Sequence, residues 1–487
     1  MWPPSSMDVM NYIKGEWVKT NNVKPVMSPY SGEVCGNVHF ANSELVDQAI
    51  DAAELAQKQW EQIPLKARTQ VLLSFREELL KNLEEISHII AFESGKTPAE
   101  ANAGLMKGIE VLEYAASLQN ADVGGKLEVS RGVFCEYRRK ALGVVASITP
   151  FNFPAMVPMW SIPTSIALGN AYIWKPSEKT PLTAKFIADA FDRAGLPKGV
   201  LTVLHGQKDV VESIIDNPKT KALAFVGSSP VAKALYQRAT NLGKRALCLG
   251  GAKNHIILLP DADLEVTGQG ISDSFTGCAG QRCMAASVLL AVGDVDKHIE
   301  RIRERASSQK LGETMGAIIT KDQLEFLHQA IGRAEEEGAK IVLDGRKASP
   351  PKNFAGGFWI GPTILDHVKP GSEAASKELF GPILSIVRCE NLSEALKIQN
   401  SSPYGNAASI FTSSGPLAER VAQNTECGMF GVNIGVPVPR EPFSFAGVKE
   451  SKFGHGEITG EGSLDFWSDK RKITTKWEMQ NDSNWMS

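Results

Sequence analysis

Short apolar runs alternate with helical patterns through most of this chain, and this alternation limits the possible folds more than any other feature. Between residues 142 and 251 each apolar run ends in polar, Gly or Pro residues, and the intervening segments have the spacing of amphipathic helices. Strands that alternate with helices form parallel sheets through crossover connections, and such sheets bind ligands at the carboxyl ends of their strands. The pattern predicts strands at Val144–Thr149, Ala171–Lys175, Val200–Leu204, Ala222–Val226 and Arg245–Leu249.

The same pattern recurs after Asn254 and predicts a second α/β domain. A chain of 487 residues is too long for one core and is expected to form two or three domains. The second set of strands is predicted at His255–Leu259, Ala286–Val292, Lys340–Leu343 and Ile383–Arg388. Its helices are predicted at Leu264–Phe275, His298–Ser307, Lys321–Gly338 and Gly415–Asn424.

The part of the chain before residue 142 predicts packing helices and then an arm. Asn42 is a candidate N-cap for a first helix, a second helix is expected over Leu65–Phe92, and a third over Ala99–Ala116. Gly124 and Gly125 then introduce a charged, alternating segment that predicts a β-hairpin. The strand-like segment Lys472–Trp477 could pair with this hairpin or with another subunit.

Charge and cysteine usage exclude several classes of protein. With 52 Lys and Arg against 55 Asp and Glu, the net charge of −3 gives no basic footprint for nucleic acid or an anionic membrane. The longest apolar stretch, Met156–Trp174, is interrupted by Pro and Gly, so we expect no membrane span and a soluble, cytoplasmic protein. The seven cysteines are odd in number and include no C-x-x-C pair, which argues against a disulfide framework and a metal site.

The Gly-rich segment Phe275–Met284 contains Cys283 beside Arg282 and is a candidate nucleophile loop. A neighbouring cation raises the thiolate fraction of a cysteine, and we expect Gly277 and Gly280 to let the backbone approach a substrate closely. Cys283 could equally be a small buried apolar residue, which is the commoner fate of a free cysteine.

Polar residues follow three strands of the first predicted sheet. Asn152, in Thr149-Pro-Phe-Asn-Phe-Pro154, could donate to an oxyanion or merely complete a turn. Lys175 and Glu178 could bracket a ribose diol, and Glu178 would repel a 2′-phosphate; alternatively they form an exposed ion pair.

Phe225-Val-Gly-Ser-Ser-Pro230 follows the fourth strand of this sheet. Ser229 and Pro230 are a plausible N-cap and first residue for a helix over Val231–Leu242, whose free N–H groups suit a diphosphate. Gly227 would allow close approach and Ser228 would donate. The G-x-G-x-x-G fingerprint of dinucleotide sites is absent from this segment.

Seven motifs in a fixed order resemble those of the aldehyde dehydrogenase superfamily, and the resemblance covers nearly the whole chain. The motifs are Glu93-Ser-Gly-Lys96, Pro150-Phe-Asn-Phe-Pro154, Lys175-Pro-Ser-Glu178, Phe225-Val-Gly-Ser228, Gly280-Gln-Arg-Cys283, Glu378-Leu-Phe-Gly-Pro382 and Pro403-Tyr-Gly405. The resemblance implies that Cys283 is the nucleophile and Asn152 the oxyanion donor. It implies an NAD site made by Thr149, Phe151, Lys175, Glu178, Gly227, Ser228, Glu378 and Phe380.

One departure from the superfamily pattern concerns the fate of the acyl-enzyme. Members that hydrolyse it usually carry Glu-Leu-Gly-Gly, whereas this chain has Cys248-Leu-Gly-Gly-Ala-Lys-Asn-His255, so the glutamate position falls on Leu249 or, shifted by one, on Cys248. Without that base, water attacks a thioester poorly, while a thiol is a better nucleophile. The segment is similar to the methylmalonate-semialdehyde dehydrogenase branch, as are Leu204-His-Gly206 and Gln281-Arg-Cys-Met-Ala285, and that branch passes the acyl group to coenzyme A with loss of CO2.

The same branch holds the substrate carboxylate with two arginines. Arg282 matches one of them, but the other position is Lys107, in Lys107-Gly-Ile-Glu110. Lysine keeps the charge and loses the bidentate geometry, which leaves the exact semialdehyde open. Arg440 is a second candidate cation without an assigned place.

The resemblance therefore implies an α/β aldehyde dehydrogenase-like fold with two doubly wound parallel-sheet domains and an oligomerisation arm. We expect an NAD-binding domain over 1–123 and 142–251, a catalytic domain over 252–440, and the arm over 124–141 and 460–487. The expected partners are a small aldehyde, NAD, coenzyme A as co-substrate, and copies of the same chain in a dimer or tetramer. Two alternatives stay open: a hydrolytic aldehyde dehydrogenase that yields a free acid, and a catalytically silent scaffold.

Overall fold

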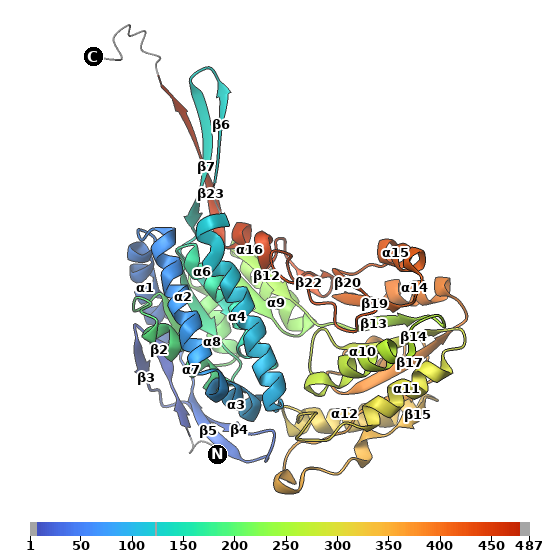
Figure 1. The fold of residues 1–487 in the computed structure, drawn as a ribbon. Helices are drawn as coiled ribbons and strands as arrows, with labels where there is room; N and C mark the ends of the chain where they lie inside the picture. Colours follow the sequence, from blue (N-terminus) through green and yellow to red (C-terminus); the bar gives the residue numbers. More distant parts are fainter. Residues whose placement is uncertain (1–6, 122–123, 478–487) are drawn as a thin grey trace.

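Two sheets flanked by helices form the body of the molecule (Figure 1), in a computed structural model that describes residues 7–121 and 124–477. The strands of the first sheet, in spatial order, are β22 (Lys452–Phe453), β12 (Arg245–Leu249), β11 (Thr220–Val226), β8 (Val144–Ile148), β9 (Ala171–Lys175), β10 (Leu201–Val203), β2 (Asn11–Ile13) and β3 (Glu16–Val18). Its inner strands are parallel, and β22, β2 and β3 pair antiparallel at the edges. All residues of β8, β9 and β10 are buried, which explains why these strands are continuous apolar runs.

Helices cover both faces of the first sheet. One buried cluster joins it to α1 (Ser43–Trp60), α8 (Lys208–Asp216) and α9 (Ser229–Asn241). The cluster on the other face includes α2 (Leu65–Lys81), α3 (Leu83–Ser94), α4 (Pro98–Ala121), α5 (Met156–Met159), α6 (Ile162–Ala167), α7 (Pro181–Arg193) and α16 (Gly460–Trp467).

The second sheet has parallel strands except at one edge, where β15 pairs antiparallel with β16. Its order is β15 (Lys340–Leu343), β16 (Thr363–Asp366), β17 (Ile383–Cys389), β14 (Ala286–Val292), β13 (Asn254–Leu258), β19 (Ala407–Phe411) and β20 (Met429–Val432). Its helices are α10 (Leu264–Thr276) and α11 (Asp296–Ser307) on one face, and α12 (Lys321–Glu336), α13 (Glu373–Ser376), α14 (Leu392–Ser401) and α15 (Gly415–Asn424) on the other.

The helices of the amino-terminal part differ from the sequence prediction at one point. Asn42 caps α1 as expected, since its side chain accepts from the backbone N–H of Leu45. The single helix predicted over Leu65–Phe92 is wrong: the chain leaves the helical region at Asn82, and α2 and α3 lie on either side of it. The Asn82 side chain donates to the Glu78 carbonyl at 2.7 Å, a local hydrogen bond that competes with helix continuation.

Two small sheets were not predicted. One contains β1 (Met7–Val9), β5 (Val34–His39) and β4 (Val23–Met27), and the other pairs β18 (Tyr404–Gly405) with β21 (Val448–Lys449). No helix in the described part of the chain combines the length and apolar character that a membrane crossing requires.

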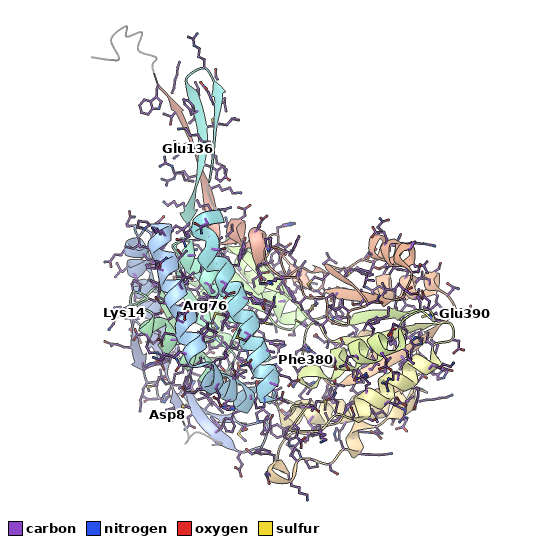
Figure 2. The ribbon with its side chains drawn as sticks, in the orientation of Figure 1. Asp8, Lys14, Arg76, Glu136, Phe380 and Glu390 are labelled. Atoms are coloured by element: carbon purple, nitrogen blue, oxygen red, sulfur yellow. The ribbon has the colours of Figure 1, made fainter. Side chains whose placement is uncertain are left out.

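A three-stranded arm projects from the body (Figure 1) and joins two distant parts of the chain. The predicted hairpin is β6 (Gly125–Ser130) and β7 (Val133–Ala141), and β23 (Ser468–Lys476) pairs antiparallel with β7 along its whole length. The predicted pairing of the carboxyl-terminal strand with the hairpin is therefore confirmed. Glu136, labelled in Figure 2, lies on this arm, and residues 478–487 of the predicted arm lie outside the described residues.

Asn170 ties the base of the arm to the first sheet. Its side-chain oxygen accepts from the backbone N–H groups of Leu142 and Gly143, at 2.7 and 3.1 Å. Its amide nitrogen donates to the carbonyls of Ser165 and Trp467, at 3.1 and 2.8 Å. A fully buried amide that satisfies four backbone groups holds the start of β8, the end of α6 and the end of α16 together.

Replacing Asn170 with Ala should lower the free energy of unfolding by about 2–4 kcal/mol, because buried backbone groups would lose their partners. Urea unfolding followed by circular dichroism measures the change. Asn424→Ala is the matched control, since the Asn424 side chain bonds one backbone carbonyl at the surface, and it should cost less than about 0.5 kcal/mol. Equal effects of the two substitutions would contradict the role of Asn170.

Candidate active site

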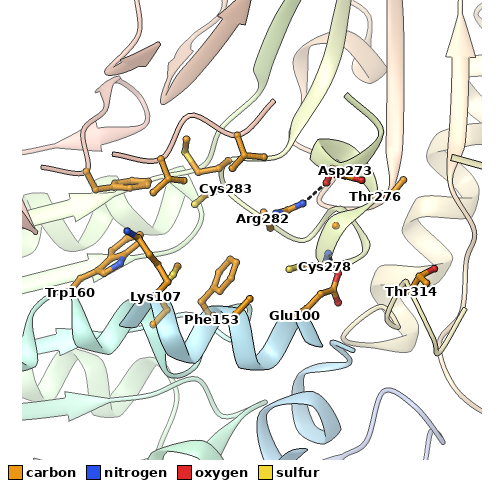
Figure 3. Close-up of a pocket in the computed structure, with 18 of the residues that line it drawn as sticks. Glu100, Lys107, Phe153, Trp160, Asp273, Thr276, Cys278, Arg282, Cys283 and Thr314 are labelled. Carbon is orange, nitrogen blue, oxygen red and sulfur yellow. Dashed lines mark hydrogen bonds between the residues drawn. The ribbon is translucent and has the colours of Figure 1, made fainter. Parts of the chain in front are cut away.

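Cys283 lies where two cavities meet. It follows α10 and a tight turn, Gly277–Gly280, and it lines both cavities. The first cavity, about 520 Å³, lies between the nucleophile loop and α4 (Figure 3). The second, about 430 Å³, extends from Cys283 over the carboxyl ends of β8, β9 and β11. This is the edge at which parallel sheets bind ligands.

Two side-chain amides hold the backbone carbonyl of Cys283. The amide nitrogen of Asn254 donates to it at 2.7 Å and that of Asn406 at 2.9 Å. Asn254 also donates to the carbonyl of Ala285 at 3.0 Å. Sequence reasoning missed both roles; Asn254 stands in the Ala-Lys-Asn-His run, whose polar residues inside an apolar strand were the available signal.

Asn152 reaches the same loop from the first sheet. Its amide nitrogen donates to the carbonyl of Gln281 at 2.9 Å, and the residue is buried at the wall of the second cavity. The alternative reading, an Asn that satisfies its own turn, is wrong for this bond, because Gln281 is 129 residues away in the sequence. A primary amide has two N–H groups, so this bond leaves the second N–H of Asn152 unused.

The thiol of Cys283 has a strongly raised pKa. Burial and, to a smaller extent, the negative charge of Glu378 raise the pKa to about 12, and Arg282 opposes this shift by a smaller amount. The lowering effect of Arg282 on the thiol pKa is therefore smaller than the raising effect of burial, contrary to the expectation that Arg282 activates the thiol. Its guanidinium donates instead to the carbonyl of Asp273 at 2.5 Å (Figure 3).

The two glycines of the loop are required by internal packing, and Gly277 also lines the first cavity. A Cβ on Gly277 would stand 1.7 Å from the guanidinium nitrogen of Arg282, and a Cβ on Gly280 would stand 2.1 Å from the carbonyl oxygen of Gly381. Gly280 also has a φ of +68°. The missing side chains therefore make room for Arg282 and for a neighbouring backbone.

All eight residues predicted for the cofactor line the second cavity: Thr149, Phe151, Lys175, Glu178, Gly227, Ser228, Glu378 and Phe380. Figure 2 places Phe380 between the two sheet-bearing halves, and its ring meets that of Phe151 edge to face, with centroids 5.9 Å apart. Lys175 is buried and its ammonium lies 3.2 Å from the carboxylate of Glu178. The alternative of an exposed ion pair is wrong for Lys175.

Burial sets the ionisation of the polar groups in this cavity. It lowers the pKa of Lys175, which the neighbouring Glu178 partly offsets. Burial also acts to raise the pKa of Glu178, but the charges of Lys175 and Lys179 and the hydrogen bonds to the carboxylate together outweigh it, and the pKa is held below its ordinary value. A carboxylate that stays ionised beside a buried lysine suits two vicinal hydroxyls better than a phosphate.

The helix behind Gly227 begins one residue earlier than predicted. Ser228, not Ser229, is the N-cap of α9. The Ser229 hydroxyl is used elsewhere: it donates to the Glu450 carbonyl at 2.7 Å and accepts from the Gly251 N–H at 2.9 Å. Ser228 is therefore the serine at the helix N-terminus that faces the cavity.

No carboxylate occupies the position of the expected hydrolytic base. Leu249 and Cys248 are both buried at the end of β12, and Gly250 and Gly251 form the wall of the second cavity. The carboxylate that faces Cys283 in this cavity is Glu378, whose pKa is raised by burial to about 7. Its oxygen accepts from the backbone N–H of Ala252 at 3.0 Å.

Lys253 is a buried cation behind this wall. Its ammonium has no hydrogen-bond partner among the described residues, and burial lowers its pKa to about 7 while Glu378 opposes that shift. Sequence reasoning did not single it out. Among residues 7–121 and 124–477, no group of His, Cys, Asp and Glu could hold a metal ion.

The structure brings Lys107 and Arg282 to the first cavity, each with a partner of its own. The Lys107 ammonium lies 2.8 Å from the carboxylate of Glu110, and Arg282 binds backbone carbonyls at the end of α10. The Nε atom of Arg282 is buried and bonds no described residue. Arg440 is exposed and lines neither cavity.

Apolar side chains form most of the remaining wall of the first cavity. They are Phe153, Met156, Trp160, Met284, Val436, Val438 and Phe445. Trp160 and Phe445 pack with ring centroids 4.6 Å apart. The cavity is thus a mainly apolar pocket with a few charged groups, the usual character of a small-molecule site.

Comparison with known proteins agrees with this arrangement. The model of the family described as "Aldehyde dehydrogenase family" matches residues 17–473. The malonate-semialdehyde dehydrogenase 2 of Geobacillus thermodenitrificans (strain NG80-2) is 39% identical over 476 residues, which cover 96% of this chain and 98% of that protein.

Two solved structures of similar proteins superpose closely on this chain. The methylmalonate-semialdehyde dehydrogenase of Oceanimonas doudoroffii superposes with a TM-score of 0.95 at 36% identity, covering 97% of this chain and 99% of that one. A Sinorhizobium meliloti 1021 structure complexed with NAD has a TM-score of 0.95 at 35% identity, covering 98% and 99%.

Alkylation of Cys283 by iodoacetamide in the protein without ligands should accelerate about tenfold per pH unit between pH 7 and 10, because the thiolate is the reactive form and its pKa of about 12 lies above this range. Mass spectrometry of the Cys283 peptide separates it from the other thiols, and Cys283→Ser supplies the blank. A plateau below pH 9 would show that the thiol is activated without a ligand.

Proposed function

The chain belongs to the aldehyde dehydrogenase family, and on that premise we propose that it oxidises malonate or methylmalonate semialdehyde with NAD and passes the acyl group to coenzyme A with loss of CO2. One observation carries the proposal. Cys283 lines both a cavity with two cations, Lys107 and Arg282, and a cavity that contains the carboxylate of Glu178, while the apolar Leu249 stands where a hydrolytic base is expected.

The oxidation half of the reaction uses Cys283 and Asn152. The thiolate attacks the aldehyde carbon, and the oxygen becomes an oxyanion that accepts from the free N–H of Asn152 and from the backbone N–H of Cys283. Collapse of this adduct expels a hydride and leaves a thioester on Cys283. The hydride acceptor is NAD, which supplies only that chemistry.

The second cavity fits NAD by the chemistry of its walls. Glu178 and Lys175 would hold the adenosine ribose, Ser228 and the N-terminus of α9 the diphosphate, and Glu378 with Phe380 the nicotinamide ribose and ring. A Cβ on Gly251 would stand 2.4 Å from a Glu378 oxygen, so this wall depends on glycine to leave Glu378 in the cavity. The S. meliloti relative complexed with NAD supports the same choice.

The acyl-transfer half of the reaction is supported by the lack of a carboxylate at positions 248 and 249, where a hydrolytic base would be expected. The carboxylate of the substrate is β to the thioester carbonyl, which accepts the electron pair of the breaking carbon–carbon bond as CO2 leaves; a proton then completes the acyl group. The thiol of coenzyme A attacks the thioester and returns Cys283 as the thiolate. The products would be acetyl-CoA from malonate semialdehyde and propionyl-CoA from its methyl derivative.

Hydrolysis to a free acid is the second candidate, and one observation favours it. Glu378 has a pKa of about 7 and faces Cys283 in the described structure, so it could act as a base toward water once the nicotinamide has left. A silent scaffold has no comparable support, because Cys283 and Asn152, the residues proposed as nucleophile and oxyanion donor, line the same cavity.

We also propose that the protein forms a homo-oligomer through the arm. Leu127, Val129 and Trp477 on the arm are 68%, 52% and 70% exposed, which is unusual for large apolar side chains on a small isolated sheet. A second copy of the chain would cover them.

The choice between acyl transfer and hydrolysis is tested with malonate semialdehyde and NAD, with and without coenzyme A. We expect steady NADH formation and acetyl-CoA only with coenzyme A, and one NADH per Cys283 at most without it, because the thioester then has no efficient acceptor. Steady turnover to a free acid without coenzyme A would support the hydrolytic candidate. No NADH from any of a panel of aldehydes would contradict both.

In the proposed function Lys107 and Arg282 together hold the substrate carboxylate, and we call this pair the carboxylate clamp. Lys107 should therefore matter for carboxylated substrates and not for uncharged ones. Lys107→Met should lower kcat/KM for malonate semialdehyde by about one to two decades, the worth of one charge-assisted hydrogen bond, and change kcat/KM for propanal less than twofold. Glu110→Gln is the matched substitution in the opposite direction: it frees Lys107 from its ion pair and should lower KM for the semialdehyde. Equal losses for both aldehydes in Lys107→Met would contradict the clamp.

A further inference from the structure

The turn that leads to Cys283 has an unusual backbone. Cys278, Ala279 and Gly280 have φ values of +53°, +51° and +68°, so three successive residues adopt the left-handed conformation. Only glycine takes this conformation without cost, and the two L-residues do so only where the surroundings hold them. The turn directly precedes Gln281, Arg282 and Cys283, so its conformation sets where the thiol points.

Glu100, from the first turn of α4, holds the first of these residues. Its Oε1 atom accepts from the backbone N–H of Cys278 at 2.5 Å. Figure 3 shows the Glu100 side chain rising from α4 toward the turn at Cys278. The two residues are 178 positions apart in the sequence, so this bond joins separate parts of the fold.

The other carboxylate oxygen fixes Glu100 itself. Its Oε2 atom accepts from the backbone N–H of Thr97 at 3.0 Å, and the Thr97 hydroxyl accepts from the backbone N–H of Glu100 at 3.2 Å. This reciprocal arrangement is a capping box at the start of α4. The carboxylate thus bridges two backbone N–H groups, one on α4 and one on the nucleophile loop.

Gln281 restrains the far end of the same turn. Its amide nitrogen donates to the carbonyl of Ala317 at 3.0 Å, and its side-chain oxygen accepts from the backbone N–H of Ile319 at 3.0 Å. Gln281 is thereby fixed to the second half of the molecule, whereas Glu100 fixes Cys278 to α4 in the first. Removing either restraint lets the left-handed residues relax.

We propose that Glu100 is a positioning residue for the nucleophile, holding the left-handed turn at Cys278 so that Cys283 faces the aldehyde beside Asn152. Glu100 also lines the first cavity together with Lys107, seven residues further along α4. The helix that carries the proposed carboxylate clamp is therefore bonded directly to the loop that carries the thiol. The distance between the clamp and the nucleophile depends on this carboxylate.

The proposal rests on the proposed function, in which Cys283 is the nucleophile. Kinetic measurements distinguish a positioning role of Glu100 from a purely structural one. Glu100→Ala should lower kcat about 10–100-fold, the effect of a misplaced reacting group, with KM for the aldehyde and Kd for NAD within threefold of the unmodified enzyme. Glu100→Gln, which keeps one oxygen acceptor for the Cys278 N–H, should lose less than Glu100→Ala.

The matched control for loss of a helix cap is Glu394→Ala. Glu394 occupies the same place in α14, where its backbone N–H bonds the Asn391 side chain at 3.0 Å and its carboxylate accepts from the N–H of Glu390 at 2.7 Å. It lines neither cavity. We expect this variant to retain kcat within twofold, and a loss equal to that of Glu100→Ala would overturn the proposal.

The substitution Cys278→Gly supplies the decisive comparison. Because glycine adopts the left-handed conformation freely, Glu100→Ala with Cys278→Gly should regain at least about fivefold in kcat over Glu100→Ala alone. Glu100→Ala with Cys278→Ala should regain nothing. Equal rates for the two double variants would overturn the proposal even if Glu100→Ala is impaired.

Iodoacetamide labelling of Cys283 distinguishes failure of this inference from failure of the proposed function. We expect a changed labelling rate in Glu100→Ala and restoration with Cys278→Gly. If Cys283→Ala retains turnover in the otherwise unmodified enzyme, the proposed function falls. If Cys283→Ala is inactive and Glu100→Ala is fully active, only the role of Glu100 falls.

Discussion

Amide side chains from both sheets bind the backbone of one short loop, and the active site depends on these hydrogen bonds. Asn152, after β8 of the first sheet, bonds the Gln281 carbonyl; Asn254 and Asn406, from the second sheet, bond the Cys283 carbonyl. Each bond satisfies a backbone group that would be costly to bury alone. The loop is thus bonded to both halves of the molecule, and the sulfur of Cys283 lies on this shared element.

The chemistry of the site follows from its apolar surroundings. Burial raises the pKa of Cys283 and of Glu378 and lowers that of Lys253, so each of these groups is biased toward its uncharged form. A thiol in this state is protected from oxidants and alkylating agents, since only the thiolate reacts.

Much of the fold could be predicted because local patterns determine it. Strands such as Ala171–Lys175 and Ala286–Val292 were predicted to the residue, since buried parallel strands are short apolar runs bounded by loops. All eight residues that the motifs assigned to the cofactor line the second cavity. Prediction failed where partners lie far apart in sequence: the Ser229 hydroxyl bonds the carbonyl of Glu450, and the Glu100 carboxylate bonds the backbone N–H of Cys278. The break at Asn82 was missed for a different reason, because apolar periodicity continues across it.

The pairing of β23 with β7 also bears on how the molecule is made. Cys135 and Thr474, which face each other across these strands, are 339 residues apart in the chain. At ribosomal rates of about 5–20 residues per second, the hairpin waits roughly 20–70 s for its third strand. Until synthesis has passed Lys476, β7 presents an open edge to solvent or to a chaperone. The arm, and any assembly that uses it, can therefore be completed only after the whole body of the protein has been synthesised.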